Sequence, residues 1–452
     1  MKKLSGKFPF IGSLGDKRTA NVVKNSFVSG ILKMLTLACS LLMVPITIDY
    51  LNQENYGIWM AMTSILYWFV FLDVGLGNGL RNYLAEALSR NDLVSARSYI
   101  STAYILLSII SVLLAFVFVP LIYVLDMNEI FHTSSIDGTQ LANVLAIAVV
   151  FSLIQFVAKN VGMVYIAMQK YALSDLITFL GTLSALALVF IMTKTMQSDL
   201  AKVVAAFSGM PVLVFILASI HLVFKHPELR PSFCCINLPV AKKIVSKGVG
   251  FFLIQVTSCL VIFGSANIFI SHYCGPEQVT VYNVSFKLFN VLIIIYTILI
   301  SPLWNAYTDA AVKNDYAWIH RSFKKSLLLW ALSVLVGIVM FALSGIFFRL
   351  WIGDSVEIPM SVSLCVFIYV CMFNFNNCVT YLINGLNKIR VQIITSILAT
   401  ALYLVCIFFI KDSYGIIGIS LSMTVAYLLM AVVHLYQCYL LINRKAKGIW
   451  DK

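Results

Sequence analysis

Residues 326–348 of this 452-residue chain read SLLLWALSVLVGIVMFALSGIFF, a run without a charged side chain. About 20 consecutive apolar residues are enough for an α-helix to cross the hydrocarbon core of a bilayer. Similar runs recur along the chain, which is 61% hydrophobic and only 11% charged, against about 25% charged in an ordinary soluble domain. Such a composition cannot be covered by a water-facing surface. The sequence therefore predicts an all-α polytopic membrane protein.

Apolar runs separated by charges and glycines predict twelve transmembrane helices. They begin near residues 25, 56, 99, 141, 172, 203, 248, 279, 326, 360, 391 and 413. With the basic residues 1–24 in the cytoplasm, followed by an uncleaved first helix, 25 of the 32 Lys and Arg residues fall in cytoplasmic segments and 4 in outer loops. This asymmetry follows the positive-inside rule and places both termini in the cytoplasm.

The formal net charge of +13 belongs to this topology, because the basic residues lie between hydrophobic runs. A nucleic-acid partner would need them gathered on one folded face. We therefore expect no nucleic-acid binding.

The chain contains an internal repeat. A shift of 223 residues superposes Glu54 on Glu277, and the pair Asn91-Asp92 on Asn314-Asp315. Later in each half the shift becomes 218, where Lys170 meets Lys388. Two six-helix halves with the same orientation are predicted, and in transporters this arrangement places the substrate path between the halves.

The repeat sets the predicted domain organisation. A cytoplasmic N-terminus (1–24) precedes an N-terminal six-helix lobe (25–225), a cytoplasmic linker (226–247), a C-terminal six-helix lobe (248–442) and a cytoplasmic tail (443–452). Because the duplicated halves already enclose one path, we expect the translocation unit to be a monomer.

Five charges lie within predicted spans: Lys33, Asp73, Lys159, Asp175 and Lys287. An unpaired charge there costs at least about 2.5–3.5 kcal/mol, so intramembrane ionisable residues usually serve a function. The three lysines are predicted to line a polar cavity; alternatively they reach the interface or pair with a carboxylate. The two aspartates are either simple partners of Lys33 and Lys159 or proton carriers, since burial raises a carboxylate pKa.

Residues 73–82 read DVGLGNGLRN, with glycines at every second position where the second helix leaves the bilayer. This spacing does not form the four-residue packing stripe of membrane helices, so a flexible or unwound segment is predicted. Arg81 and Asn82 would then lie at the cytoplasmic mouth, where Arg81 either binds a phosphate or serves only as a positive-inside anchor.

Enzymatic and metal sites are not indicated. The sequence has no Walker-type glycine loop and no paired-aspartate metal motif in its cytoplasmic loops. Its ten cysteines lack metal-ligand spacing, and its six histidines are scattered. We therefore predict a transporter without a cofactor, metal or catalytic residue.

Several motifs resemble the polysaccharide flippases of the multidrug/oligosaccharidyl-lipid/polysaccharide exporter superfamily, above all the Wzx-type O-antigen flippases. They are Tyr50-Leu51, Tyr56-Gly57 with Trp59, residues 73–77, Arg81-Asn82, and Asn384-Gly385 with Asn387-Lys388. Asn52 departs from the pattern, which has glycine there, whereas the second half carries Gly275.

The resemblance implies a MATE-like fold and a lipid-linked oligosaccharide substrate. That substrate would be an O-antigen or capsule repeat unit on undecaprenyl diphosphate, moved from the cytoplasmic to the periplasmic leaflet of a bacterial inner membrane by alternating access. Lys33, Lys159, Lys287, Arg81 and Asn82 would bind it, and Asp73 and Asp175 would couple an ion. A polysaccharide polymerase and a chain-length regulator are the implied protein partners.

The alternative within the same superfamily is a cation-coupled drug antiporter. Such a protein favours a buried acidic cavity for cationic substrates, whereas this chain has three lysines and two peripheral aspartates within its predicted spans. The charge balance therefore favours an anionic substrate.

Overall fold

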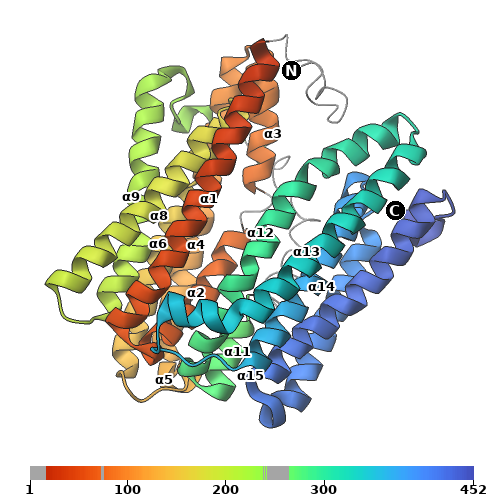
Figure 1. Ribbon diagram of the computed structural model, residues 1–452. Coiled ribbons are helices and arrows are strands. Elements are labelled where there is room, and N and C mark those ends of the chain that lie inside the picture. The colour runs from red at the N-terminus through yellow and green to blue at the C-terminus, as the bar shows by residue number, and fades with distance from the viewer. Residues whose placement is uncertain (1–16, 73–75, 238, 240, 242–263, 452) are drawn as a thin grey trace. The chain divides into compact units, whose positions relative to one another are not determined.

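The computed structural model describes residues 17–72, 76–237, 239, 241 and 264–451, and within these ranges it contains helices and no strand (Figure 1). The all-α prediction is confirmed. In the described part, ten helical segments are long and apolar enough to cross a membrane: Val28–Leu51, Leu93–Val124, Gly138–Ala167, Tyr171–Thr195, Leu200–Lys225, Pro276–Val312, Tyr316–Ile352, Met360–Gly385, Arg390–Ile410 and Tyr414–Ile442.

The helices follow one another along the chain with short connections. They are α1 (Lys17–Leu51), α2 (Gln53–Leu72), α3 (Leu76–Ser89), α4 (Leu93–Val124), α5 (Met127–Phe131), α6 (Gly138–Ala158), α7 (Asn160–Ala167), α8 (Tyr171–Thr195), α9 (Leu200–Lys225), η1 (Pro227–Leu229), η2 (Phe233–Cys235), α11 (Ala266–Cys274), α12 (Pro276–Val312), α13 (Tyr316–Ile352), α14 (Met360–Gly385), α15 (Arg390–Ile442) and η4 (Gly448–Asp451). The 20-residue helix α2 occupies the place of the predicted second span. The predicted seventh span falls mainly on residues 242–263, outside the described ranges.

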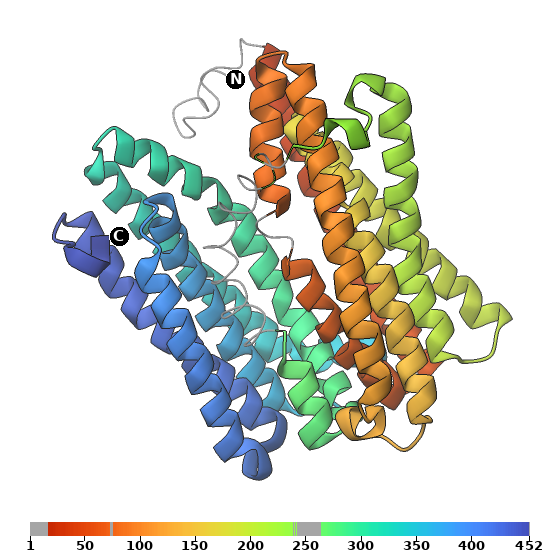
Figure 2. The ribbon, with the colours of Figure 1, turned by 180° about the vertical axis from the view of Figure 1, so that it is seen from behind.

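The described chain divides into two compact units. Unit 1 lies within Met1–Ile46, Asp73–Val124 and Val144–Val249. In it α3 packs against α4 and α7, and α8 packs along α9 (Figure 2). The apolar side chains Leu80, Leu84 and Ile100 are almost fully buried at the contact between α3 and α4.

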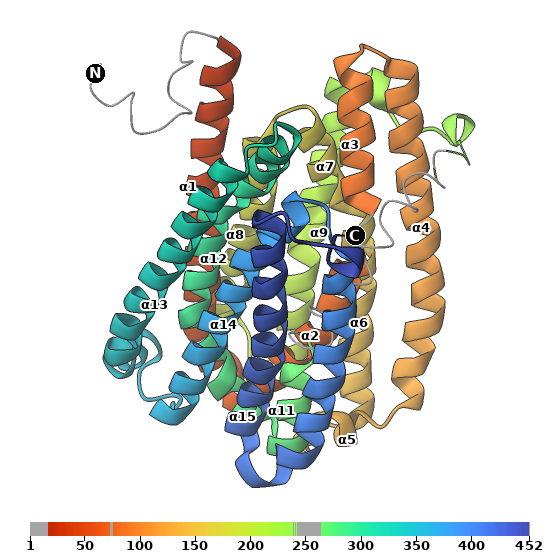
Figure 3. The ribbon, with the colours of Figure 1, turned by 90° about the vertical axis from the view of Figure 1, so that its right-hand side faces the viewer.

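Unit 2 lies within Thr47–Leu72, Leu125–Asn143 and Gly250–Lys452. Helix α14 packs against α12, α13 and α15, while α2 and α11 pack against α12 (Figure 3). Helix α15 comprises two spans that reverse direction near Gly415, whose φ of 49° and ψ of −128° are not helical. Glycine tolerates this conformation because it has no Cβ.

The first half of the predicted linker is attached to α4 within unit 1. Arg97 Nε donates to the carbonyl of Arg230 at 2.9 Å, and the backbone amides of Ser232 and Asn237 donate to Ser101 Oγ and Thr102 Oγ1, both at 3.0 Å. The division into lobes at 25–225 and 248–442 stays a prediction.

The backbone repeats itself at the predicted shift of 223 residues. Asn91 and Asn314 adopt φ of 55° and 58°. Their backbone amides donate to the carbonyls of Leu88 and Ala311 at 3.2 and 3.0 Å. Asparagine tolerates the left-handed region better than most residues, which explains why it occupies both turns.

Side chains repeat at the same shift. Arg90 pairs with Glu86 at 2.7 Å, and Lys313 pairs with Asp309 at 2.7 Å, in each case four residues apart on a helix. Both pairs are largely exposed, so each adds little stability. Their agreement in register shows that the repeat at this shift extends to side-chain contacts.

The later shift of 218 residues is also visible in the backbone. Gln169 and Asn387 have φ of 61° and 56°, and the amides of Lys170 and Lys388 donate to Tyr165 and Ile383. At the first loop, Asn52 has a φ of 73° and Gly275 a φ of 90°. Asn52 therefore adopts the positive φ for which the second half uses glycine.

The predicted unwound segment after the second helix is wrong in its later part. Gly77 and Gly79 lie within helix α3, and residues 73–75 are outside the described ranges. Glycine is a poor helix former, but Leu80 and Leu84 on the same helix are fully buried against its neighbours. This tertiary packing outweighs the local preference of the glycines.

Candidate intramembrane site

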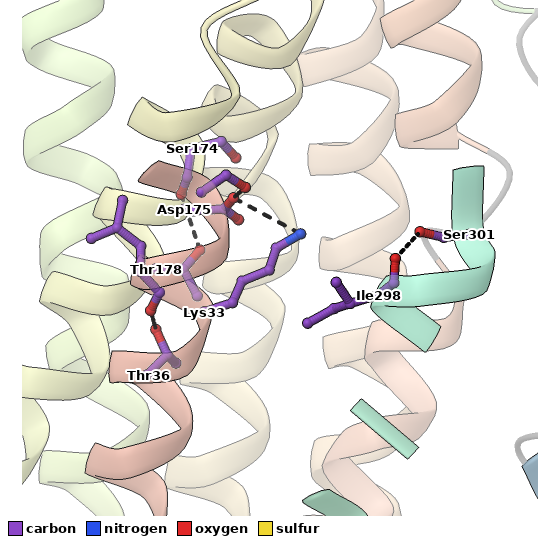
Figure 4. A network of polar contacts seen from close by, with 9 residues as sticks. Lys33, Thr36, Ser174, Asp175, Thr178, Ile298 and Ser301 are labelled. Carbon is purple, nitrogen blue, oxygen red and sulfur yellow. Dashed lines mark hydrogen bonds and ion pairs between the residues drawn. The ribbon is translucent and has the colours of Figure 1, made fainter. Parts of the chain in front are cut away.

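The charged centre of unit 1 is formed by Lys33 on α1 and Asp175 on α8, with their Nζ and Oδ2 atoms 3.9 Å apart (Figure 4). Ser29 Oγ donates a hydrogen bond to the same carboxylate oxygen. Ser29 and Lys33 are four residues apart and so share one helix face. The hydroxyl and the ammonium group therefore converge on one carboxylate.

This contact combines two of the predicted site residues, but it does not enclose the lysine. The side chain of Asp175 is 23% exposed, whereas that of Lys33 is 52% exposed. An ammonium group has three hydrogen-bond donors. Lys33 can therefore bind an anion while its ammonium group stays paired with Asp175. This pairing gives the simple-partner interpretation of Asp175 a geometric basis.

Lys159 lies where the span Gly138–Ala167 is interrupted between α6 and α7. Its Nζ is 5.6 Å from the centroid of the Phe156 ring, within the range of a cation–π contact. The following residue, Asn160, is fully buried and donates to the carbonyl of Phe156 at 3.0 Å. Asn160 Oδ1 has no hydrogen-bond partner among the described residues. Lys159 therefore stands beside a buried acceptor that was not singled out in the sequence.

Lys287 lies on α12 in unit 2 and is half-buried. One turn earlier, Asn283 Nδ2 donates to Asn267 Oδ1 at 2.9 Å. No ion pair found in the described part of the chain involves Lys287. The polar pair one turn before Lys287 is thus neutral, and it leaves the positive charge available to an anion.

The structure places the remaining predicted residues as follows. Arg81 is on α3 and is partly exposed, and Asn82 is in the same helix. Asp73 lies outside the described residues. The structure therefore brings Lys33 and Asp175 together, and the roles of Arg81, Asn82 and Asp73 stay predictions.

Hydrogen bonds join the two sequence repeats at one end of unit 2. We name those among Gln53, Thr280 and Glu277 the repeat contact. Thr280 Oγ1 donates to the carbonyl of Gln53 at 2.6 Å, and Gln53 Nε2 donates to the carbonyl of Glu277 at 3.3 Å. Ser271 Oγ donates to the carbonyl of Phe131 at 2.9 Å. The predicted topology places this end on the outer side of the membrane.

Gly57, part of the first-loop motif, allows this close approach. A Cβ atom at residue 57 would lie 1.7 Å from the carbonyl oxygen of Pro276, the first residue of α12. The obstacle is backbone, so no side-chain movement could relieve the clash. The motif glycine is therefore explained by the packing of α2 on α12.

Unit 2 also contains a buried polar cluster that the sequence interpretation missed. His434, which is fully buried, has Nδ1 at 3.0 Å from Asn376 Oδ1 and Nε2 at 2.7 Å from Thr395 Oγ1. The asparagines of the FNFNN run at residues 373–377 were the available signal. Polar side chains in an apolar span usually find partners inside the bundle.

A metal centre is not found in the described ranges, because no group of three or more His, Cys, Asp or Glu side chains there could hold an ion. The intramembrane polar groups described above are three lysines, one carboxylate, one imidazole, and several amides and hydroxyls. Such groups suit the recognition of an anionic, hydroxyl-rich ligand.

The helical fold, with its ten apolar segments in the described part of the chain, defines the class of protein as a multi-span membrane protein. It is similar to the solved inward-facing conformation of a multidrug resistance MATE family transporter of the MOP superfamily, with a TM-score of 0.74 and 15% identity over 93% of this chain and 98% of that one. The outward-facing conformation of such a transporter matches with a TM-score of 0.65 and 15% identity, over 96% of this chain and 97% of that one. At this identity the likeness shows the fold.

The family is shown by the sequence itself. The model of the family described as polysaccharide biosynthesis protein matches residues 22–303. The chain belongs to this family.

Curated relatives agree with the transporter class. A Salmonella typhimurium protein described as an O-antigen transporter is 23% identical over 91% of this chain and 95% of its own length. A Salmonella typhi protein of the same description is 24% identical over 64% of this chain and 65% of its own length, slightly less than two thirds. The predictions of a multi-pass membrane protein, of the superfamily and of a non-enzymatic transporter are confirmed.

Proposed function

We propose that this protein is a flippase for an oligosaccharide linked to undecaprenyl diphosphate. It would move an O-antigen or capsule repeat unit from the cytoplasmic to the periplasmic leaflet of the bacterial inner membrane. The family match and the O-antigen transporters among its relatives support the substrate class. The diphosphate is anionic, and the glycan supplies many hydroxyl groups.

The observation that carries this proposal is the intramembrane lysine Lys287, which has no ion pair within the described residues. A cation in a span is costly unless it is neutralised, and a diphosphate neutralises it in the loaded carrier. Lys33 and Lys159 serve as further contacts for the diphosphate or the sugars. Arg81 and Asn82 receive the phosphate at the cytoplasmic mouth.

Transport proceeds by alternating access. The repeat contact of Gln53, Thr280 and Glu277 closes the outer side when intact and parts when the carrier opens outward. Asp73 and Asp175 are the candidate groups for coupling to an ion gradient. Coupling to an ion gradient would supply the free energy that favours substrate transport in one direction across the membrane over the other.

The test uses a strain that lacks its own flippase and carries Lys33→Ala, Lys159→Ala or Lys287→Ala. The matched control is Lys202→Ala, because Lys202 is half-exposed and pairs with the exposed Asp199 at 3.4 Å. Surface polysaccharide and lipid-linked repeat units on the cytoplasmic face are scored, with protein amounts checked by blot. We expect at least one of the three to lose display at least tenfold while the protein accumulates normally, and Lys202→Ala to display normally.

Three outcomes would contradict the proposal. Normal display by all three variants would show that the lysines are interface anchors. Absence of trapped lipid-linked repeat units in the strain without the protein would overturn the substrate class. If adding the protein to that same strain restored export of a cationic drug, the antiporter would be favoured instead.

A further inference from the structure

A groove opens on unit 2 between α13 and α15, along segments that are apolar enough to cross a membrane. Its volume is about 460 Å³, which is in the range of small-molecule sites. Its walls come from His320, Phe323, Lys324 and Leu327 on α13 and from the α15 residues Val432, Leu435, Tyr436, Tyr439, Ile442 and Asn443. None of the intramembrane lysines of the proposed transport site lines it.

The polar and apolar residues that line the groove are separated along the helices. On α13 the basic side chains His320 and Lys324 lie nearer the start of the helix than Leu327. On α15 the polar Asn443 follows the last turn, and Val432 is eleven residues earlier. At 1.5 Å per residue that separation is about 16 Å, close to half of the roughly 30 Å hydrocarbon core. The groove is therefore polar at one end and apolar over the depth of one leaflet.

The first turns of helix α13 are basic. Helix α13 contains His320, Arg321, Lys324 and Lys325 in its first three turns and has no Asp or Glu along its length. At the end of α15, Arg444 lies 4.2 Å above the ring of Tyr316 and donates to the carbonyl of Asn314 at 3.1 Å, within unit 2. These contacts hold the two helix ends together around the groove.

We propose that this groove binds one anionic glycerophospholipid of the cytoplasmic leaflet. Lys324 and His320 contact the phosphate, Tyr436 and Tyr439 lie at the level of the glycerol, and an acyl chain packs along Leu327, Leu435 and Val432. Basic pockets between transmembrane helices on the cytoplasmic side are suited to anionic headgroups. Tyrosines are enriched at that depth because one end of the ring is apolar and the other polar.

The lining distinguishes this occupant from the transported lipid. An oligosaccharide needs several amide and hydroxyl partners, and this groove offers only Asn443 and two tyrosine hydroxyls beside its two basic groups. A compact phosphate headgroup needs no more than these. The inference therefore stands independently of the proposed function.

The test measures phospholipid retained by the full-length protein, purified from bacterial membranes into detergent, by native mass spectrometry. Lys324→Gln with His320→Gln removes the headgroup contacts, and Lys325→Gln is the matched control, since Lys325 is exposed next to Lys324 but does not line the groove. A second variant, Leu435→Trp, fills the groove and keeps both basic groups. Nanodiscs of phosphatidylglycerol or phosphatidylethanolamine supply the competing lipids.

We expect the wild type and Lys325→Gln to retain one phosphatidylglycerol in preference to phosphatidylethanolamine. The double variant and Leu435→Trp should retain it at least fivefold less. Equal retention by all variants, or equal retention of the two lipids, would overturn the site. Preferential binding of a polyprenyl diphosphate over phosphatidylglycerol would overturn the phospholipid assignment. If the double variant fails to fold, the Leu435→Trp variant decides the question.

Discussion

Asp92 and Asp315 stand at equivalent positions of the two repeats, and each caps the helix that follows it. Asp92 Oδ1 accepts a hydrogen bond from the backbone amide of Ser95 at 3.0 Å, and Asp315 Oδ1 accepts one from that of Trp318 at 2.9 Å. A side chain at this position satisfies one of the unpaired amides at a helix start. The repeat is therefore preserved in cap chemistry as well as in sequence.

The cap at Asp92 predicts a pH dependence of stability. Hydrogen bonds from the side chain and then the backbone amide of Ser95 lower the pKa of Asp92 from its ordinary value. A carboxylate with a lowered folded-state pKa contributes stability above its unfolded pKa of about 4 and loses it as the pH falls through the folded-state pKa. The thermal midpoint of Asp92→Ala in detergent should therefore be below that of the wild type at pH 7, and the difference should shrink toward pH 3.

The control for this prediction is Asp354→Ala, because the side chain of Asp354 is 95% exposed. A difference between Asp92→Ala and the wild type that grows on acidification would contradict the assignment.

The left-handed turns predict a paired response to substitution. Asn91→Val and Asn314→Val should each lower the free energy of unfolding by about 1–2 kcal/mol, because a side chain with a branched Cβ is strained at positive φ. Asn91→Gly and Asn314→Gly should stay close to the wild type. Thermal unfolding in detergent measures the stability of all four variants. Valine variants as stable as the glycine variants would show that the turns are not constrained.

The Lys33–Asp175 pair predicts different results for folding and transport. Lys33→Asp should reduce the amount of folded protein, because it places two carboxylates together near Ser29. Adding Asp175→Lys restores opposite charges and should recover protein levels. If Lys33 contacts substrate, the double variant should still display at least tenfold less polysaccharide than the wild type. Full recovery of display would mean that the pair serves only to stabilise the fold.

The repeat contact predicts that a crosslink stops transport. Gln53→Cys with Thr280→Cys, in a background carrying Cys274→Ser, should form a disulfide on oxidation because Thr280 contacts the Gln53 backbone at 2.6 Å. Display should fall on oxidation and return with reductant, and variants that carry only one of the two introduced cysteines should not respond. Undiminished transport by the fully crosslinked protein would show that this contact does not open.

The buried cluster at His434 predicts a loss of stability. His434→Ala removes both hydrogen bonds of the imidazole and leaves Asn376 Oδ1 buried without it, at a cost of about 1–3 kcal/mol. The control is His221→Ala, since His221 is exposed on α9. Thermal unfolding in detergent compares the two variants. An equal effect at both histidines would contradict the structural role of the cluster.

The repeat was predictable because its markers are local. Charged pairs such as Glu86 with Arg90, and turn residues such as Asn91, keep their identity or chemistry in both halves. The helical conformation of Gly77 and Gly79 was not predictable from the low helix preference of glycine, since the burial of Leu80 and Leu84 decides it. His434 and Asn160 were missed because spans that are apolar on nearly all sides carry little periodic signal. Their partners become visible only when helices distant in sequence pack together.

The packing of α2 on α12 has a consequence for biosynthesis. Gly57 in α2 fits closely against Pro276, yet Pro276 is translated more than 200 residues after α2 ends at Leu72. At roughly 5–20 residues per second, the ribosome needs about 10–40 s to supply that partner. During this interval α2 waits in the bilayer with one face exposed to lipid or to a membrane chaperone. Its docking on α12 is then a late event, which makes assembly of the transporter sensitive to the speed of translation.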